Sequence, residues 1–528
     1  MPNNVPSKKQ WAQAFCVAPQ NVVHKIHKIL SADGDGSKQA SGAFKRKCGQ
    51  INAGTQKCFK ALSVKGEKEE DIRFYAGDLP MMLEYICGNT GWYRNRLFAI
   101  PNHTVSLVLT ADECTGGNVL SVATSKKVLM VYCAILELGE LHRPGAYLPL
   151  AAIPARDVAG IKGPGTSAIF VALLQFFQRE GWFNGFTVLG AAFQLKLFTY
   201  LGDYESVRAV FGSRGASAIR PCCLCMNVLA KGRVEAERDN YFTTIEEAST
   251  SNCQPYDTEE LFQLYDRYLR EFPNMSKRQA EEEEKFFGWN VDPASLMAKP
   301  DLRALLSLKH LSPSAIGHLF HPSLWNGTCH KGEATASWYL LPLLGFYGFE
   351  LLDGQDPLEW QSFKALLEVF HALREVRRSL EWTRSLALAQ EKHQRLFVAC
   401  YPGQVRPKHH LRLHLPALYE KFGVYIDMFP TEARHKLYKR MLADCLQYLW
   451  SEKDGKMGLH ILGRMLNMIT QQLIDKPWCN EMLPPVYSAE DVEKEMPGTD
   501  AEISAGYAFG SLQIKREQVV LWQHGAGI

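Results

Sequence analysis

The chain has 528 residues, of which 46% are hydrophobic, and its 59 Lys and Arg nearly balance its 56 Asp and Glu. This length normally holds more than one domain, and the small net charge of +3 excludes a global positive field as the means of binding a polyanion. The 14 irregularly spread cysteines and the lack of a bilayer-length apolar run predict a reduced intracellular protein without a membrane role.

Residues 1–77 are polar, apart from an amphipathic pattern over Gln10–Leu30 that predicts one helix. The following segment, Ser31–Thr55, is rich in Gly, Ser and Lys and is typical of a basic linker. Its Lys45-Arg46-Lys47 tripeptide suits nuclear import or a phosphate contact, although a solvated loop is the simpler explanation.

Residues 105–135 contain three strand-like runs, which are separated by short turns at Gly116-Gly117 and Ser125-Lys126. The alternation of apolar residues and the close spacing of the runs predict an antiparallel meander. Its three expected strands are Val105–Leu109, Asn118–Thr124 and Val128–Ile135.

A helix over Ser167–Glu180, capped by Ser167, and a fourth strand over Phe193–Leu201 complete the expected core. A helical crossover back to the first strand makes the first and fourth strands parallel, so that their C-terminal ends meet at one sheet edge. Asp112 and Asp203 follow those ends and are therefore expected side by side. This order predicts an α/β protein with a ribonuclease H-like mixed sheet.

Residues 226–405 are expected to form a large helical insertion between the fourth strand and the final catalytic helix. Within them, Glu259–Phe272 and Ser276–Phe287 carry charged faces, and apolar residues recur at helical spacing over Leu358–Leu396. The final helix is expected at Thr431–Trp450, with Glu432 in its first turn. The expected domains are therefore 1–77, the first part of the core at 78–225, the insertion at 226–405, the histidines and final helix at 406–455, and a C-terminal extension at 456–528.

Cys222 and Cys225 form a Cys-x2-Cys pair, and His409, His410 and His414 offer either a His-x4-His or a His-x3-His pair. Thiolate and imidazole donors at these spacings are typical of structural zinc sites. Because His409 follows Cys225 by 184 positions (409 − 225), the ion would join remote parts of one large domain. His410 and His414 share one face of a continuous helix, so helix geometry favours His410 as the partner of His414.

The carboxylates at the predicted sheet edge suit two-metal phosphoryl transfer. Magnesium binds few protein carboxylates and keeps its other positions for water and phosphate, and two ions about 4 Å apart activate the attacking oxygen and stabilise the leaving one. Structural explanations exist as well: acids end strands in many α/β folds, and Glu432 is a favourable charge at a helix N-terminus. Glu113 is an alternative to its neighbour Asp112 as the first ligand.

The chain order of two acidic strand ends, Cys-x2-Cys, helical insertion, His-x4-His and glutamate resembles a known catalytic core. The core that it resembles is that of cut-and-paste DNA transposases of the CACTA/Plavaka kind, to which the V(D)J recombinase core is related. The matching stretches are Leu109–Gly117, Tyr200–Glu205, Pro221–Cys225, Pro407–Leu415 and Phe429–His435. The resemblance implies a triad that binds Mg²⁺ or Mn²⁺, made of Asp112, Asp203 and Glu432. It implies a structural zinc site made of Cys222, Cys225, His409 and His414.

The resemblance further implies a nuclear, homo-oligomeric DNA transposase, which cleaves a phosphodiester at transposon ends and uses the freed 3′-OH for strand transfer. Cys329-His330-Lys331-Gly332 also matches the family, but Leu324–Thr328 lacks the acid and the first histidine that the family has there. This departure keeps open an alternative, a catalytically inactive or domesticated DNA-binding scaffold. A zinc-stabilised helical interaction protein is the third hypothesis.

Overall fold

The computed structural model describes residues 54–115, 127–139, 141, 143–230, 241–303, 305, 311–313, 345, 348, 356–374, 380–422, 441–442, 445, 455–475, 506–509 and 512–515. The chain divides into two compact units, residues 1–470 and 471–528. Among the described residues, no helix combines the length and the apolar character that crossing a membrane requires. The helix expected at Gln10–Leu30, the strand expected at Asn118–Thr124 and the final helix with Glu432 lie outside the described residues, except for three positions of that helix.

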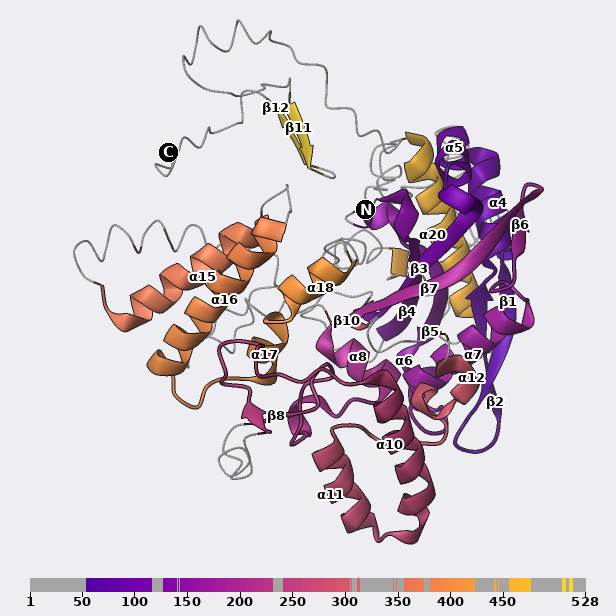
Figure 1. Ribbon diagram of the computed structural model, residues 1–528. Coiled ribbons are helices and arrows are strands. Elements are labelled where there is room, and N and C mark those ends of the chain that lie inside the picture. Colours follow the sequence, from indigo (N-terminus) through magenta and orange to yellow (C-terminus); the bar gives the residue numbers. More distant parts are fainter. Residues whose placement is uncertain are drawn as a thin grey trace, which may run out of the picture. The chain divides into compact units, whose positions relative to one another are not determined.

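A mixed β-sheet is the centre of the first unit (Figure 1). Its strands follow the spatial order β1-β2-β5-β4-β3-β7-β10, and β6 pairs with β7 off this path. Their bounds are β1 Phe59–Lys65, β2 Asp71–Gly77, β3 Thr104–Thr115, β4 Lys127–Ile135, β5 Leu148–Pro154, β6 Phe186–Val188, β7 Ala191–Gly202 and β10 Leu311–Pro313. The prediction of an α/β fold with a mixed sheet is therefore confirmed.

The strands of the antiparallel part are β3, β4 and β5, each paired with the next. The third expected strand, Val128–Ile135, is confirmed as β4, and the first is longer than expected because β3 continues to Thr115. The sequence prediction missed β5, whose residues Leu148–Pro154 show no apolar–polar alternation. All of its residues are buried, and since neighbouring side chains of a strand point to opposite faces, both faces of the sheet are covered there.

The predicted parallel pairing of the first and fourth core strands is confirmed by β3 and β7. Their register brings Thr110 opposite Leu201. Asp112 and Asp203 each follow this pair by two residues, so both acids lie at the same edge of the sheet. The short strand β10 is also parallel to β7 and pairs Leu311 with Tyr200.

The helices of the chain differ widely in length. Their bounds are α4 Leu79–Asn89, α5 Gly91–Phe98, α6 Ala155–Ala159, α7 Gly165–Arg179, α8 Tyr204–Phe211, α10 Thr258–Glu271, α11 Lys277–Phe287, α12 Pro300–Arg303, α15 Leu358–Arg374, α16 Leu380–Cys400, α17 Pro407–Arg412, α18 Leu415–Phe422 and α20 Lys456–Asp475. Among the residues that the structure describes, two short strand pairs lie outside the main sheet: β8 Val228–Leu229 with β9 Thr243–Thr244, and in the second unit β11 Gly506–Phe509 with β12 Leu512–Lys515.

Two helices illustrate how the sheet is covered. The ring of Phe170 on α7 contacts the ring of Tyr200 on β7, with 5.5 Å between the centroids. The helix α20 passes so close to β5 that a Cβ atom at Gly458 would lie 2.2 Å from the carbonyl oxygen of Ala152. Only glycine permits this close approach. The contact joins α20, near the end of the first unit, to a strand that lies some three hundred residues earlier in the chain.

The expected helix at Ser167–Glu180 is confirmed as α7, but its cap differs from the prediction. The helix starts at Gly165, and Ser167 lies inside it, where the buried hydroxyl oxygen accepts a hydrogen bond from Leu296 N at 2.8 Å. Ser167 therefore joins α7 to a segment of the insertion instead of capping the helix.

Residues 226–405 contain the expected helices α10 and α11, and α11 begins with a capping box of Ser276 and Gln279. The single long helix expected over Leu358–Leu396 is replaced by two, α15 and α16, which pack side by side (Figure 1). The indole nitrogen of Trp382 on α16 donates to the carbonyl oxygen of Ala372 on α15 at 2.6 Å. The apolar residues that recur at helical spacing thus belong to a pair of packed helices, as their pattern predicted.

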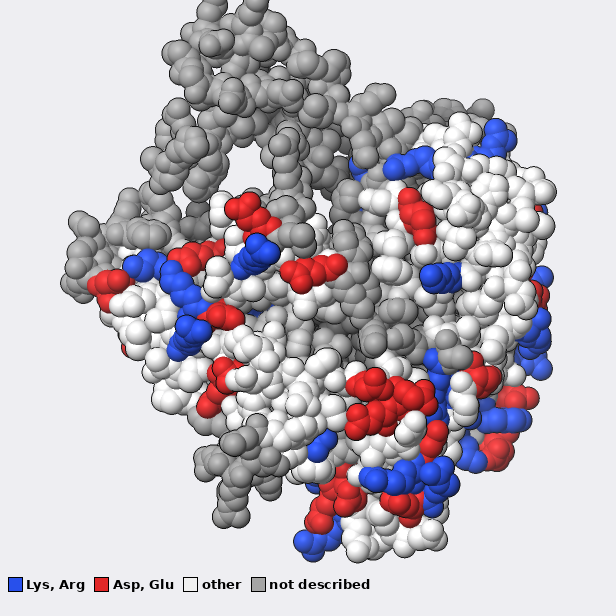
Figure 2. All heavy atoms as spheres, viewed as in Figure 1, with Lys and Arg blue, Asp and Glu red and all other residues white. Residues whose placement is uncertain are grey.

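Charged side chains of both signs are interspersed over the face of the molecule that Figure 2 shows. The α10–α11 hairpin carries several ion pairs within its helices, such as Lys285 with Glu281 at 2.8 Å and Arg278 with Glu282 at 3.0 Å. This mixture agrees with the small net charge of +3.

Candidate metal centre

The cysteine pair lies on a loop that a second loop holds in place through backbone hydrogen bonds. Tyr256 N donates to Leu224 O at 3.0 Å and Met226 N donates to Gln254 O at 2.9 Å, on either side of an isolated bridge between Cys225 and Pro255. Leu224 N also donates to Cys222 Sγ at 3.4 Å, which helps to fix the position of this sulfur. The two thiols are therefore presented by a fixed backbone.

The histidines come from α17 and the residues that follow it. Pro407 occupies the first turn, where its missing N–H is not needed. His414 N donates to Leu411 O at 3.2 Å, so the helical turn continues past Arg412 and brings His414 over His410. The two Nε2 atoms are 3.1 Å apart.

Four side chains meet in one group, Cys222, Cys225, His410 and His414, with all four candidate donor atoms within 4.8 Å of one another. His414 Nε2 is 3.6 Å from Cys222 Sγ and 3.3 Å from Cys225 Sγ. A tetrahedral zinc ion with bonds of about 2.3 Å to sulfur and 2.0 Å to nitrogen separates sulfur from nitrogen by about 3.5 Å, and two nitrogens by about 3.3 Å. The distances between the donor atoms therefore fit a zinc ion.

The group is largely buried, and the electrostatics at Cys222 suit a cation. Cys222, Cys225 and His410 are at most 2% exposed. Burial raises the pKa of the Cys222 thiol, but the hydrogen bond with Cys225 and the neighbouring His410 and His414 outweigh burial and hold this pKa well below its usual value. A thiolate is the form of cysteine that binds a metal ion. We conclude that these four residues could hold a metal ion such as zinc.

His409, the zinc ligand that the transposase resemblance implied, lies outside the group. Its Nδ1 accepts a hydrogen bond from Arg406 N at 2.8 Å, and its ring contacts Phe397 with 4.7 Å between centroids. Burial is the main cause that lowers the pKa of His409 to about 3. The structure brings into the group His410, the residue that helix geometry favoured, because α17 already includes both adjacent positions.

The structure brings two of the three candidate catalytic acids, Asp112 and Asp203, to one sheet edge, whereas Glu432 lies outside the described residues. Asp203 caps α8, where its Oδ1 accepts from Ser206 N at 2.6 Å. Asp112 Oδ1 accepts from the N–H of Glu113 at 2.7 Å. The side chain of Glu113 forms an exposed ion pair with Lys127 at 2.8 Å, away from any buried partner.

Helix α17 lies near the sheet edge that carries Asp112 and Asp203. Burial raises the pKa of Asp203, and the positive charge of Lys408 acts against that rise. Reciprocally, burial lowers the pKa of Lys408, while Asp203 and Glu205 act in the opposite direction. One short helix, α17, therefore carries His410 toward the cysteines and Lys408 toward Asp203.

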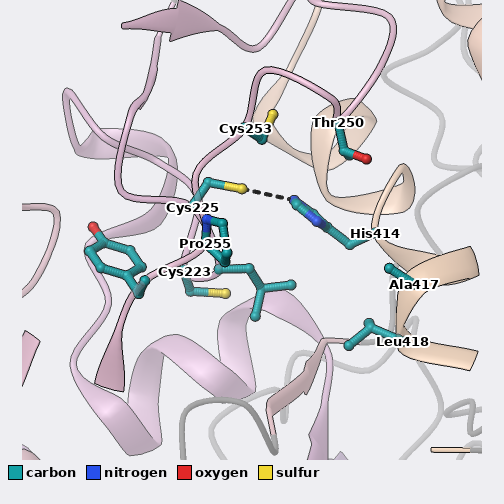
Figure 3. Close-up of a pocket in the computed structure, with 10 residues that line it drawn as sticks. Cys223, Cys225, Thr250, Cys253, Pro255, His414, Ala417 and Leu418 are labelled. Carbon is teal, nitrogen blue, oxygen red and sulfur yellow. Dashed lines mark hydrogen bonds between the residues drawn. The ribbon is translucent and has the colours of Figure 1, made fainter. Parts of the chain in front are cut away.

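A further thiol near the group, Cys253, was not predicted from the sequence. It lines a pocket of about 270 Å³ together with Cys225 and His414 (Figure 3). The other lining residues are Cys223, Leu224, Thr250, Pro255, Tyr256, Ala417 and Leu418. Cys253 follows Cys225 by 28 positions (253 − 225), a separation that matches no metal-binding motif, so only the folded loop reveals the proximity.

No protein-family model matches this sequence, and no curated protein is significantly similar to it. The function therefore has to be inferred from the residues and their arrangement.

Proposed function

We propose that this chain is the catalytic core of a DNA transposase with a ribonuclease H-like fold, of the CACTA/Plavaka kind. It would cleave a phosphodiester at transposon ends and use the freed 3′-OH for strand transfer. The element order supports the fold assignment: the antiparallel strands β3, β4 and β5, a helical crossover through α7, and the strands β7 and β10, both parallel to β3.

The observation that carries the proposal is the shared position of Asp112 and Asp203. Both acids follow the paired residues Thr110 and Leu201 of neighbouring parallel strands by two positions, and ends of parallel strands are common places for catalytic groups. Glu432 would supply the third carboxylate from the first turn of its expected helix. Paired DNA ends need paired active sites, so we propose that the protein acts as a homo-oligomer in the nucleus.

Three carboxylates at this edge would suit hard cations such as Mg²⁺ or Mn²⁺, which would activate the attacking oxygen and stabilise the leaving oxygen of the phosphodiester. The role of the protein's own residues would be to hold the carboxylates in place. Asp203 is fixed at the start of α8 by Ser206 N, and Lys408 places a positive charge near Asp203, where a phosphate would approach.

The candidate zinc group has a structural part in this proposal. It would join the cysteine loop, close after α8 in the chain, to the helix that carries Lys408. A structural zinc site stabilises the folded state directly. The ion would thereby keep Lys408 beside Asp203 and would hold the segment that leads to Glu432.

One observation favours a second candidate function, a catalytically inactive DNA-binding scaffold. Asp203 already has a structural role as the N-cap of α8, and N-cap aspartates are common without catalysis. In this case Asp203 would be needed for stability alone.

The two candidates are separated by a pair of substitutions at one position. Asparagine is as good an N-cap as aspartate, but its neutral amide oxygen binds Mg²⁺ or Mn²⁺ much more weakly than a carboxylate does. The transposase proposal predicts that Asp203→Asn keeps the melting temperature and loses divalent-metal-dependent nicking of supercoiled DNA, as does Asp112→Asn. Glu113→Gln, next to Asp112 and exposed, is the control and should nick as the wild type does.

The scaffold alternative predicts a different pattern. Wild-type protein would not nick DNA with either Mg²⁺ or Mn²⁺, Asp203→Ala would lower the melting temperature, and Asp203→Asn would change nothing. That pattern would overturn the transposase proposal.

A further inference from the structure

Cys253 is held beside the metal-binding cysteines by the backbone of its own loop. Its N–H donates to Thr250 O at 3.0 Å, and the next residue, Gln254, donates its N–H to the side-chain oxygen of Asn227 at 2.7 Å. Asn227 also donates to Asn252 O at 2.9 Å, so the residues on both sides of Cys253 are anchored to the loop of Cys225. The proximity of Cys253 to this loop is therefore built into the fold.

The thiols of Cys253 and Cys225 differ in exposure although they are neighbours. Both side chains line the same pocket, where Cys253 lies above Cys225 in the view of Figure 3. Cys225 is 1% exposed, whereas Cys253 is only partly buried. The pocket of about 270 Å³ that both residues line has room for several water-sized molecules, each of which takes about 30 Å³ in the liquid. A small solute can thus reach Cys253 before it reaches Cys225.

We propose that Cys253 is a peroxide-reactive thiol and that Cys225 is its resolving partner, so that oxidation forms a disulfide within the metal centre. An accessible thiol beside a second, less accessible one is the usual arrangement of such pairs. The inference concerns the thiols of the metal centre and does not depend on the proposed transposase activity.

The chemistry has two steps and needs hydrogen peroxide as the oxidant. The Cys253 sulfur attacks one peroxide oxygen, the O–O bond breaks, and the thiol becomes a sulfenic acid while one water is released. The Cys225 sulfur then attacks the sulfenic sulfur, the S–O bond breaks, and the leaving oxygen departs as a second water after taking up a proton. The two thiols are thereby oxidised to one disulfide, and the peroxide is reduced to two waters.

The disulfide removes one donor from the group of four, because Cys225 Sγ can no longer bind an ion. Cys222, His410 and His414 remain, and with three donors the affinity for zinc falls. Since the group joins residues of two remote chain segments, oxidation would also release α17 from the cysteine loop. A reductant that cleaves the disulfide restores the site.

The test uses the full chain, purified in reductant, desalted and treated with hydrogen peroxide. Digestion without reductant followed by mass spectrometry identifies any cross-linked peptides, and a chromogenic chelator follows zinc release. We expect a peptide pair joined through Cys225 and Cys253, zinc release with the same time course, and recovery of zinc binding after reduction. The cross-link itself is detectable whether or not the protein binds DNA.

Two variants make the test specific. Cys253→Ser removes only the reactive thiol, and its zinc release under peroxide should fall to that of untreated protein. Cys400→Ser removes another partly exposed thiol, at the end of α16, and should behave as the wild type does. Zinc release from Cys253→Ser at the wild-type rate, or a cross-link that joins Cys225 to Cys222 or Cys223, would overturn the inference.

Discussion

The hydroxyl of Ser206 donates a hydrogen bond to the carbonyl oxygen of Ala111 at 2.6 Å. Ala111 precedes Asp112, just past the last residue of β3 that pairs with β7, while the N–H of the same Ser206 donates to the carboxylate of Asp203 at 2.6 Å. The hydroxyl also contacts the hydroxyl of the buried Tyr200. One serine in the first turn of α8 therefore joins the segments of β3 and β7 that lead to the candidate catalytic acids.

Replacing this serine should loosen the sheet edge. Ser206→Ala removes the hydroxyl that bridges Ala111 and Tyr200, and we expect the free energy of unfolding to fall by about 1–2 kcal/mol. Urea unfolding measures the change. Ser217→Ala is the matched control, because Ser217 donates an exposed hydroxyl to Arg214 O and its loss should cost less than about 0.5 kcal/mol. Equal effects of the two substitutions would show that the bridge does not stabilise the edge.

A buried arginine tests how α17 is anchored. Arg412 is 1% exposed and donates to Gln394 Oε1 on α16 at 2.9 Å. Burial lowers the pKa of this guanidinium to about 9. Gln394→Leu leaves the buried cation without that acceptor and should destabilise the protein by about 3 kcal/mol or more. The double variant with Arg412→Met should recover the part of the loss that the unpaired cation causes, while the carbonyl oxygen of Ile245, which accepts from Gln394 Nε2 at 3.2 Å, still lacks its donor.

A double-mutant cycle in chemical denaturant measures this coupling. If the double variant is less stable than Gln394→Leu alone, Arg412 stabilises α17 through contacts other than its bond to Gln394.

The lowered pKa of His409 predicts that the stability of the protein depends on pH. An exposed imidazole has a pKa of about 6.5, whereas burial, helped by Arg412 and Arg406, lowers the pKa of His409 to about 3 in the folded state. Below pH 6.5 this histidine becomes protonated in the unfolded chain but stays neutral in the folded chain. Its contribution to the free energy of unfolding is therefore full above pH 6.5 and is lost as the pH falls toward 3. Wild-type protein should lose about 2 kcal/mol between pH 6.5 and 5 from this group.

The measurement is the free energy of unfolding at both pH values for wild type and for His409→Gln. Glutamine does not titrate, and its side-chain oxygen can accept the Arg406 N–H in place of the imidazole. The difference between the two proteins should therefore change by about 2 kcal/mol over this pH range. Parallel pH profiles would contradict a buried neutral His409.

Regular patterns made part of the fold predictable. Alternating apolar residues indicated β3 and β7, a continuous apolar run indicated β4, and the order of strands and crossover indicated that β3 and β7 are parallel. Like β4, β5 is buried on both faces and has no alternation, but it was missed because its two prolines are more typical of a loop. β10 has only three residues and depends on its pairing with β7. That pairing leaves no local pattern in the sequence.

The site was predictable where helix periodicity or a short motif defined it. The Cys-x2-Cys spacing indicated one half of the group, and the i, i+4 rule indicated His410 with His414. The resemblance to a transposase family pointed instead to His409, which the fold uses to accept the Arg406 N–H. Cys253 could not be predicted, because its position beside Cys225 depends on the backbone pairing of two loops, which no short motif indicates.

The candidate metal centre is tested most directly by the zinc content of purified protein, measured by elemental analysis for the wild type and for matched pairs of variants. We predict about one zinc per chain in the wild type, in His409→Ala and in Cys223→Ser, because His409 and Cys223 lie outside the group of donors. His410→Ala and Cys222→Ser should lose the ion and melt at lower temperature. Wild-type protein without zinc, or zinc that is lost with His409→Ala and kept with His410→Ala, would contradict the assignment.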